Sequence, residues 1–194
     1  MNATPVLLGA RLRLAPFGPR QISERYLGWL ADPVVNEFSR RRDMPPAARD
    51  DAEKYLVGLR TDEAVLAIES FEFGHIGNVK YGPIDSVNKR SDIAIMIGEK
   101  AAWGHGLGAE AVYLVTRWLF ESRGMNKVDA GSTNPAFLKL VGRLGWQIEK
   151  AERSGTAPER KVVAMFACDF QRLKEFESVD GRFVLSQVKS GHLT

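Results

Sequence analysis

The chain has 194 residues, 44% of them hydrophobic and 26% charged, which is enough to bury one core and typical of a globular domain. Its net charge of +3 is too small and too dispersed to indicate nucleic acid as a partner. The sequence contains no run of 18 apolar residues and no charged-then-apolar leader, so we expect a cytoplasmic protein without membrane association, either a monomer or a homodimer.

Cysteine and histidine are too scarce for a disulfide framework or a cysteine-rich metal centre. The single cysteine, Cys168, lies in the apolar run 162–168, and we expect its thiol to be buried and inert. His75, His105 and His192 lack the spacing of metal ligands, so we expect no metal site.

Hydrophobic periodicity predicts a mixed α/β sheet covered by helices. A turn is expected at Gly82-Pro83 and 85–88. We expect residues 1–170 to form one domain. The extension at 171–194 contains a segment, 183–188, that is either an extra strand or a partner-binding segment. In chain order we expect a strand at 11–17, helices at 20–30 and 47–60, strands at 64–70, 75–81 and 91–98, a helix at 108–123, a strand at 127–131, a helix at 134–144, and strands at 146–150 and 161–169.

The stretch 103–111 reads Trp-Gly-His-Gly-Leu-Gly-Ala-Glu-Ala and lies between an apolar run and an amphipathic helix. Gly104, Gly106 and Gly108 allow the backbone to come close to a ligand, because no Cβ atom blocks it. A strand that leads through such a turn into a helix exposes backbone N–H groups at the positive end of the helix dipole, where phosphate binds. The stretch therefore indicates a phosphate-bearing cofactor. A dinucleotide-binding domain would place this turn after the first strand, whereas here it follows the fourth.

The order of elements over roughly 10–170, together with two motifs, resembles the GNAT superfamily of acyl-CoA-dependent N-acetyltransferases. The cofactor loop of that family is commonly Gln/Arg-x-x-Gly-x-Gly/Ala, and this chain has Trp103 in place of the Gln or Arg. Asn134-x-x-Phe137, leading to Leu-Gly-Trp at 144–146, resembles a second family signature. The loop followed by Ala-Glu-Ala is similar to the branch that contains the ribosomal-protein N-terminal acetyltransferases. The resemblance implies a mostly antiparallel sheet of about seven strands flanked by about four helices.

The resemblance also implies that acetyl-CoA is the co-substrate. Backbone N–H groups of the loop would hold its pyrophosphate, with His105 either near the phosphates or facing solvent. The strand at 91–98 would separate from the next strand, so that its free edge pairs with the pantetheine arm and the Met96 N–H stabilises the oxyanion. Asn134 would bind the arm, cap its own helix, or do both. The residues implied for the cofactor are Met96, Ile97, Gly98, Trp103, Gly104, His105, Gly106, Leu107, Gly108, Ala109, Asn134 and Phe137.

Acetyl transfer to an amine needs a base that takes a proton from the ammonium group. Asp92 begins the strand at 91–98, matches the position of a catalytic glutamate in some family members, and shares a strand face with Met96. The alternative is an exposed aspartate paired with a neighbouring basic residue. Glu69, His75 and a chain of waters are further candidates for the base.

A proton donor for the departing thiolate is harder to identify. Val141 and Phe137 stand where many family members carry hydroxyl groups. Ser132 and Thr133 are the hydroxyl residues next to Asn134, and a thiolate is also a fair leaving group without an acid. The missing hydroxyls motivate an alternative from another class, a non-catalytic acyl-CoA-binding module.

In this family the acceptor enters opposite CoA, through a pocket that residues 29–60 would shape here. The run of three arginines at 40–42 is either solvated or a site for an acidic acceptor, such as a nucleotide-linked amino sugar. Aromatic residues of the region either line this pocket or pack in the core. We expect an N-acetyltransferase acting on a protein N-terminus or a small-molecule amine. The residues expected to contact the acceptor are Trp29, Phe38, Arg41 and Glu69.

Overall fold

The computed structural model describes residues 4–45, 47–153, 158–171, 173–179 and 182–187. The strands of this part of the chain are β1 (Leu7–Leu8), β2 (Leu12–Pro16), β3 (Ala64–Ser70), β4 (Gly74–Asp85), β5 (Arg90–Ile97), β6 (Lys127–Ser132), β7 (Gln147–Glu152), β8 (Arg160–Phe166), β9 (Leu173–Val179) and β10 (Arg182–Gln187). Its α-helices are α1 (Glu24–Ala31), α2 (Arg49–Val57), α3 (Leu107–Glu121), α4 (Pro135–Arg143) and α5 (Ala167–Phe170).

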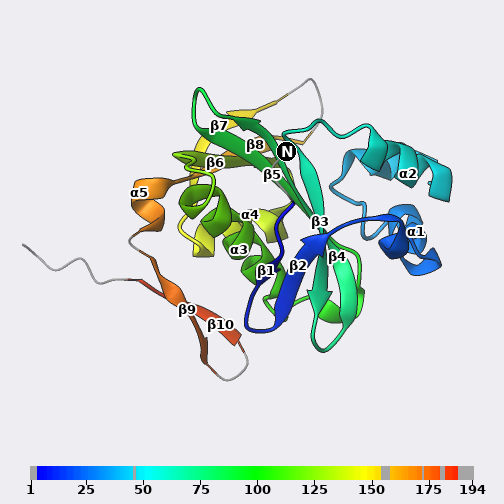
Figure 1. Ribbon diagram of the computed structural model, residues 1–194, viewed down its shortest axis with the longest axis horizontal. Coiled ribbons are helices and arrows are strands. Elements are labelled where there is room, and N and C mark those ends of the chain that lie inside the picture. Colours follow the sequence, from blue (N-terminus) through cyan, green and yellow to red (C-terminus); the bar gives the residue numbers. More distant parts are fainter. Residues whose placement is uncertain (1–3, 46, 154–157, 172, 180–181, 188–194) are drawn as a thin grey trace, which may run out of the picture.

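Eight strands form one sheet in the order β1-β2-β3-β4-β5-β6-β8-β7, and β9 and β10 pair with each other outside it (Figure 1). Strands β5 and β6 run parallel and are connected through α3, while the other neighbours in the sheet are antiparallel. The predicted mixed, mostly antiparallel sheet flanked by helices is therefore confirmed. The main sheet has one strand more than predicted, because the short β1 pairs with β2 at the edge.

Two hydrophobic clusters hold helices against opposite faces of the sheet. Ile93 of β5 is buried in the cluster that includes residues of α3 and α4. Met96 of the same strand packs against the second cluster, which contains Tyr26 and Trp29 of α1 and Ala52 of α2. Figure 1 shows α1 and α2 together at one end of the molecule and α3 and α4 against the middle of the sheet. Because side chains alternate along a strand, Asp92 and Met96 both face the α1–α2 side.

Strand β4 continues through Gly82-Pro83, which the sequence predicted to be a turn. The register with β5 shifts between Tyr81 and Ile84, and the peptide bond between Gly82 and Pro83 is cis. A β-bulge tolerates a proline inside a strand, because the residues at the bulge do not need to donate to the ladder. The other part of the predicted turn, at 85–88, is present one residue later, at 86–89.

Strand β8 ends at Phe166, and α5 replaces the last part of the strand predicted at 161–169. The helix buries Phe170 against Tyr113 and Phe120 of α3, with ring centroids 5.3 and 5.2 Å apart. It leaves the Cys168 thiol exposed, so the expectation of a buried thiol was wrong. Strand β10 overlaps the strand predicted at 183–188, whereas Val188 and His192 lie outside the described residues.

Local sequence explains where several helices begin. Ser23 caps α1 by accepting a hydrogen bond from the Tyr26 N–H at 3.2 Å, and Asn134 caps α4 ahead of Pro135. The segment between α1 and α2 contains a short 3₁₀ turn, Arg40–Asp43. Among the helices that the structure describes, none has the length and apolar character needed to cross a membrane.

Candidate active site

Strands β5 and β6 separate from one another soon after they begin. Their parallel ladder joins Arg90, Ser91 and Asp92 to residues 127–129 and then ends, although β5 continues to Ile97 and β6 to Ser132. Beyond Asp92, β5 therefore pairs with β4 on one side and presents a free backbone edge toward β6. This separation is the one that the sequence resemblance implies for the pantetheine arm.

The glycine-rich loop lies beside the far end of β5. Gly104 and Gly106 have φ angles of 80° and 76°, a left-handed conformation that favours glycine, and Gly106 is the residue before α3. A Cβ atom on Gly104 would meet nothing within 4 Å. At Gly108, a Cβ atom would lie 3.4 Å from Leu140 of α4 and 3.6 Å from Ile97. The loop is thus open on its outer side, while the first turn of α3 packs against β5 and α4.

A buried ion pair anchors this loop to the N-terminal part of the sheet. Glu110, in the first turn of α3, is 1% exposed and accepts hydrogen bonds from the Arg11 backbone N–H at 3.0 Å and from Arg11 Nε at 3.2 Å. Arg11 Nη1 also donates to the His105 carbonyl at 2.8 Å. Burial raises the pKa of Glu110, and the contacts with Arg11 oppose that shift. The His105 ring is exposed and lies 5.3 Å from the ring of Phe73.

Trp103 connects the loop to the end of β5, because its indole Nε1–H donates to the Ile97 carbonyl at 2.9 Å. The Gly98 N–H donates to the carbonyl of Ile76, the residue opposite it in the register. Bonded pairs alternate in an antiparallel ladder, so the N–H of Met96 points toward β4. The backbone groups of Ile95 and Ile97 point instead toward the edge that β6 leaves free.

Asn134 lies at the end of β6 and acts as the cap of α4. Its Oδ1 accepts hydrogen bonds from the Ala136 and Phe137 N–H groups at 2.9 and 3.4 Å. This leaves the side-chain NH₂ as the part of Asn134 that is available for a ligand. Phe137 is partly buried against the main core.

Asp92 stands at the point where β5 and β6 separate, beside Asp129 of β6. Asp129 is 5% exposed and accepts a hydrogen bond from Arg90 Nη2 at 3.0 Å. Within the described part of the chain, the Asp92 carboxylate has no hydrogen bond or ion pair. Burial and, second, the Asp129 charge raise the pKa of Asp92 to about 6, while Arg160, Lys80 and Arg90 partly offset this.

Asp129 and Arg160 were not predicted to belong to the site. The guanidinium of Arg160 covers Gly131 of β6 so closely that a Cβ atom there would overlap with it. Strand alternation could have placed Asp129 on the sheet face opposite to that of the buried Val128 and Ala130. It could not have placed Asp129 beside Asp92, because the local sequence does not determine the register of β5 and β6. For Arg160, no local signal exists.

Aromatic side chains under α1 form the wall next to Met96. The Trp29 ring covers Gly98 without room for a Cβ atom and lies 5.2 Å from the ring of His75. His75 Nε2–H donates a hydrogen bond to the Gly77 carbonyl at 2.9 Å, and burial lowers the pKa of His75. Tyr26 accepts a hydrogen bond from Asn78 Nδ2 at 3.2 Å. Trp29 and His75 therefore have packing roles in this cluster.

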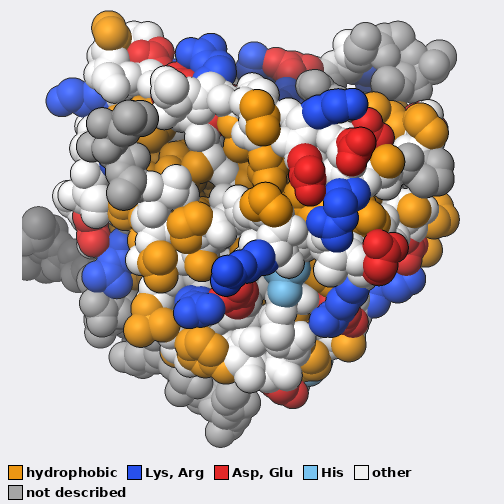
Figure 2. All heavy atoms as spheres, turned by 45° about the vertical axis from the view of Figure 1, so that its right-hand side comes forward, with side chains coloured by type: hydrophobic (Ala, Val, Ile, Leu, Met, Phe, Trp, Pro, Cys, Tyr) orange, Lys and Arg blue, Asp and Glu red, His pale blue; other side chains and the backbone are white. Residues whose placement is uncertain are grey.

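The other residues predicted to contact the acceptor are spread over the same side of the molecule. Arg41 donates to the carbonyls of Leu30 and Pro45 at 3.2 and 2.6 Å, so its guanidinium fixes the loop after α1. Phe38 is 44% exposed, and Glu69 pairs with Arg13. Figure 2 shows acidic and basic side chains interspersed with hydrophobic ones on the side that carries α1 and α2.

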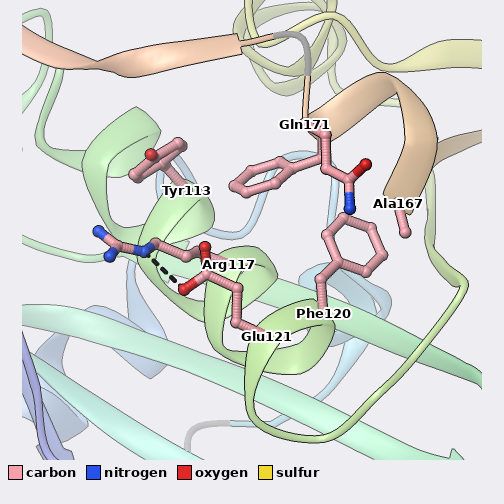
Figure 3. Close-up of a pocket in the computed structure, with 7 residues that line it drawn as sticks. Tyr113, Arg117, Phe120, Glu121, Ala167 and Gln171 are labelled. Carbon is pink, nitrogen blue, oxygen red and sulfur yellow. Dashed lines mark hydrogen bonds and ion pairs between the residues drawn. The ribbon is translucent and has the colours of Figure 1, made fainter.

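A pocket of ≈ 340 Å³ lies between α3 and α5 (Figure 3). It contains none of the predicted site residues. Its walls are aromatic, and the ion pair of Arg117 Nε with Glu121 at 3.0 Å lies at its side. The residues that line it are Tyr113, Arg117, Phe120, Glu121, Ala167, Phe170 and Gln171.

Solved structures share this architecture. A GCN5-related N-acetyltransferase from Brucella melitensis is 16% identical, with a TM-score of 0.74 over 88% of this chain and 82% of that one. A spermidine N-acetyltransferase from Vibrio cholerae, solved with CoA and spermine, is 14% identical, with a TM-score of 0.72 over 84% of this chain and 99% of that one. A GNAT-family acetyltransferase from Bacillus anthracis is 11% identical, with a TM-score of 0.69 over 84% and 98%.

No curated protein matches the chain in sequence. The profile of the acetyltransferase (GNAT) domain, however, matches residues 11–147, which include the glycine loop, the separating strands and Asn134. The open left-handed glycines at the start of α3 fit the phosphates of CoA, since they expose backbone N–H groups without side chains in the way. The chain therefore belongs to the GNAT acetyltransferase domain family, and it is an acyltransferase whose acetyl donor is acetyl-CoA.

Proposed function

We propose that the protein transfers the acetyl group of acetyl-CoA directly to a primary amine, which is either a protein N-terminus or a small molecule. The observation that carries the proposal is the separation of β5 from β6 beside the glycine loop. The backbone of 104–109 would hold the pyrophosphate, and the free edge of β5 and the Asn134 NH₂ would hold the pantetheine arm. Trp103 would affect the cofactor indirectly, because its indole N–H holds the Ile97 carbonyl in place at the end of the free edge of β5.

Asp92 is the proposed base. With a pKa of about 6 it is mostly ionised at neutral pH, yet basic enough to accept a proton from an ammonium group. The neutral amine then forms the N–C bond as the C–S bond breaks, and the remaining excess proton on nitrogen passes to the departing sulfur. Met96 was expected to stabilise the developing oxyanion, but strand alternation favours the N–H of Ile95 or Ile97 for this contact.

Several finer predictions belong to this proposal. The likeness to the ribosomal-protein acetyltransferases and a nucleotide-linked amino sugar as acceptor rest on the sequence alone. So do the domain boundary at 170 and the cytoplasmic location. The small-molecule option has a parallel in the spermidine acetyltransferase, which was solved with spermine. A non-catalytic binding module stays the alternative, since Val141 is buried and provides no hydroxyl.

A matched pair of glycine substitutions tests the proposed cofactor loop. Gly106 and Gly124 flank α3, both have left-handed φ angles (76° and 65°), and at neither would a Cβ atom meet an obstacle closer than 3.5 Å. Both aspartate substitutions should therefore strain the backbone similarly, but only Gly106→Asp adds a carboxylate where the pyrophosphate would lie. We expect calorimetry to show that Gly106→Asp reduces the affinity for acetyl-CoA roughly 100-fold or more, because charge-assisted hydrogen bonds to the phosphates are lost. Gly124→Asp should change this affinity little.

Release of free thiol from acetyl-CoA in the presence of amines tests catalysis. Turnover with any primary amine, lost in Gly106→Asp, supports the proposal. Tight binding of acetyl-CoA without turnover on protein N-termini, amino sugars or other small amines would favour the binding module. Equal acetyl-CoA affinity in both variants would refute the assignment of the loop.

A further inference from the structure

Arg160 occupies the space beside the proposed base. Its guanidinium lies over Gly131, which follows Asp129 by two residues on β6 and faces the same side of the sheet. Two residues along a strand span about 7 Å. Asp129 is in turn the register neighbour of Asp92. A carboxylate that can accept a proton and a guanidinium therefore lie near each other on the same face of the sheet, on the acceptor side of the gap between β5 and β6.

The charge of Arg160 is only partly balanced. Its Nη1 donates to Glu152 Oε2 at 2.9 Å, and the same carboxylate is also paired with Lys150. One acidic side chain thus serves two cations. In the described part of the chain, Nε and Nη2 of Arg160, the nitrogens nearest to Gly131, have no acceptor. The Arg160 side chain is 42% exposed, so a ligand can reach it.

The other cations around Asp92 have partners of their own. Lys80 pairs with Glu63 at 2.7 Å, and Arg90 pairs with Asp129 at 3.0 Å. Lys127 pairs with Glu149 and lies 3.7 Å from Asp129. Among the described residues, Asp92 has no ion pair, and Arg160 shares its one carboxylate with Lys150, so these two groups are the least fully paired of the cluster. They have opposite charges, and an acceptor of matching polarity would satisfy both.

We propose that the acceptor is an amine that carries an anionic group, a carboxylate or a phosphate, which Arg160 binds while the amine lies at Asp92. The inference rests on the proposed acetyl transfer and adds the class of acceptor. A guanidinium binds such oxygens through two parallel N–H donors, and Nε and Nη2 form one such edge. A polyamine would bring positive charge against Arg160, and an uncharged amine would leave that edge without a partner.

Matched acceptors that differ only in the anionic group test this inference. We would compare L-phenylalanine with L-phenylalaninamide, and glucosamine 6-phosphate with glucosamine, by free-thiol release. Arg160→Gln removes the proposed contact, and Lys150→Gln is the control, since it removes a charge from the same cluster without touching Gly131. We expect kcat/KM of wild type to favour an anionic member. Arg160→Gln should lower that value roughly 10- to 100-fold while Lys150→Gln leaves it near wild type, in line with the loss of a charged hydrogen bond.

The outcomes separate this inference from the proposed function. Turnover that is equal for charged and uncharged members, or slowed equally for both by Arg160→Gln, overturns the inference and leaves acetyl transfer standing. If no amine is acetylated, calorimetry of the same compounds on the protein with bound CoA decides. Binding of an anionic member that Arg160→Gln abolishes supports the Arg160 site while the transfer proposal fails. Absence of such binding to wild type overturns the inference.

Discussion

Replacing Asp92 by asparagine should stabilise the fold at neutral and alkaline pH. Asp92 is half-buried beside the negative charge of Asp129, and its pKa rises from the ordinary 3.8 to about 6. Above pH 6 the folded protein carries a charge there that the unfolded chain accommodates more easily in water. A shift of about 2 units corresponds to about 3 kcal/mol, so ionisation of Asp92 lowers the free energy of unfolding by up to that amount at pH 8.

The sign of the pH dependence follows from the same shift. Below pH 3.8 both states hold the proton, and the cost of ionisation is absent; it grows as the pH rises through the window from 3.8 to 6. Asparagine carries no charge at any pH. The stability gained by Asp92→Asn should therefore approach about 3 kcal/mol at pH 8 and fall to about half of that at pH 5.

Urea unfolding of wild type and Asp92→Asn at pH 5 and pH 8 measures this difference. Asp85→Asn is the control of opposite sign. Hydrogen bonds from Asn88 and Val87 lower the pKa of Asp85 below 3.8, so the stability that its charge contributes is complete above that pH, and this variant should lose stability by the same amount at pH 5 and at pH 8. If Asp92→Asn is no more stable than wild type at pH 8, or if its gain does not grow with pH, Asp92 is not a buried carboxylate beside a like charge.

Two further substitutions probe the neighbours of the reacting groups. Asp129→Asn removes the like charge from Asp92, so the acidic limb of the pH profile of kcat/KM should move down by roughly one pH unit, and an unchanged limb would contradict the coupling of the two carboxylates. Trp103→Phe removes the N–H donated to the Ile97 carbonyl and should raise KM for acetyl-CoA roughly 2- to 10-fold, the worth of one hydrogen bond. The matched change Trp118→Phe, in the C-terminal half of α3 and away from the loop, should leave that KM unchanged.

Features that are determined by residues adjacent in the sequence could be predicted from it. The glycine loop, the cap at Asn134 and the strand at 64–70 are each specified by a few adjacent residues, and the structure has them where they were predicted. Gly82-Pro83 shows the limit of such reading. The same two residues suit a turn or a bulge, and pairing with β5 decides between them.

The charged part of the site depends on contacts between distant segments. Asp129 approaches Asp92 through the register of two parallel strands, and Arg160 reaches the site from β8 by lying over a glycine of β6. Neither contact follows from residues close in sequence. Arg41 shows the reverse case, because a run of arginines suggests ligand binding, while this side chain bonds to two backbone carbonyls. Composition alone cannot distinguish a binding arginine from one that closes a loop.

The anchor between Arg11 and Glu110 makes the N-terminal segment part of the proposed cofactor site. The two residues are 99 positions apart, so the loop reaches its final form only after β2 has joined the sheet. A chain still emerging during synthesis, or one that lacks its first strand, would display the glycine sequence without the bonds that hold it. Under the proposed assignment of the loop, competence to bind acetyl-CoA is thus tied to completion of the tertiary structure. A ligand that binds to the loop would correspondingly stabilise the sheet edge formed by β1 and β2.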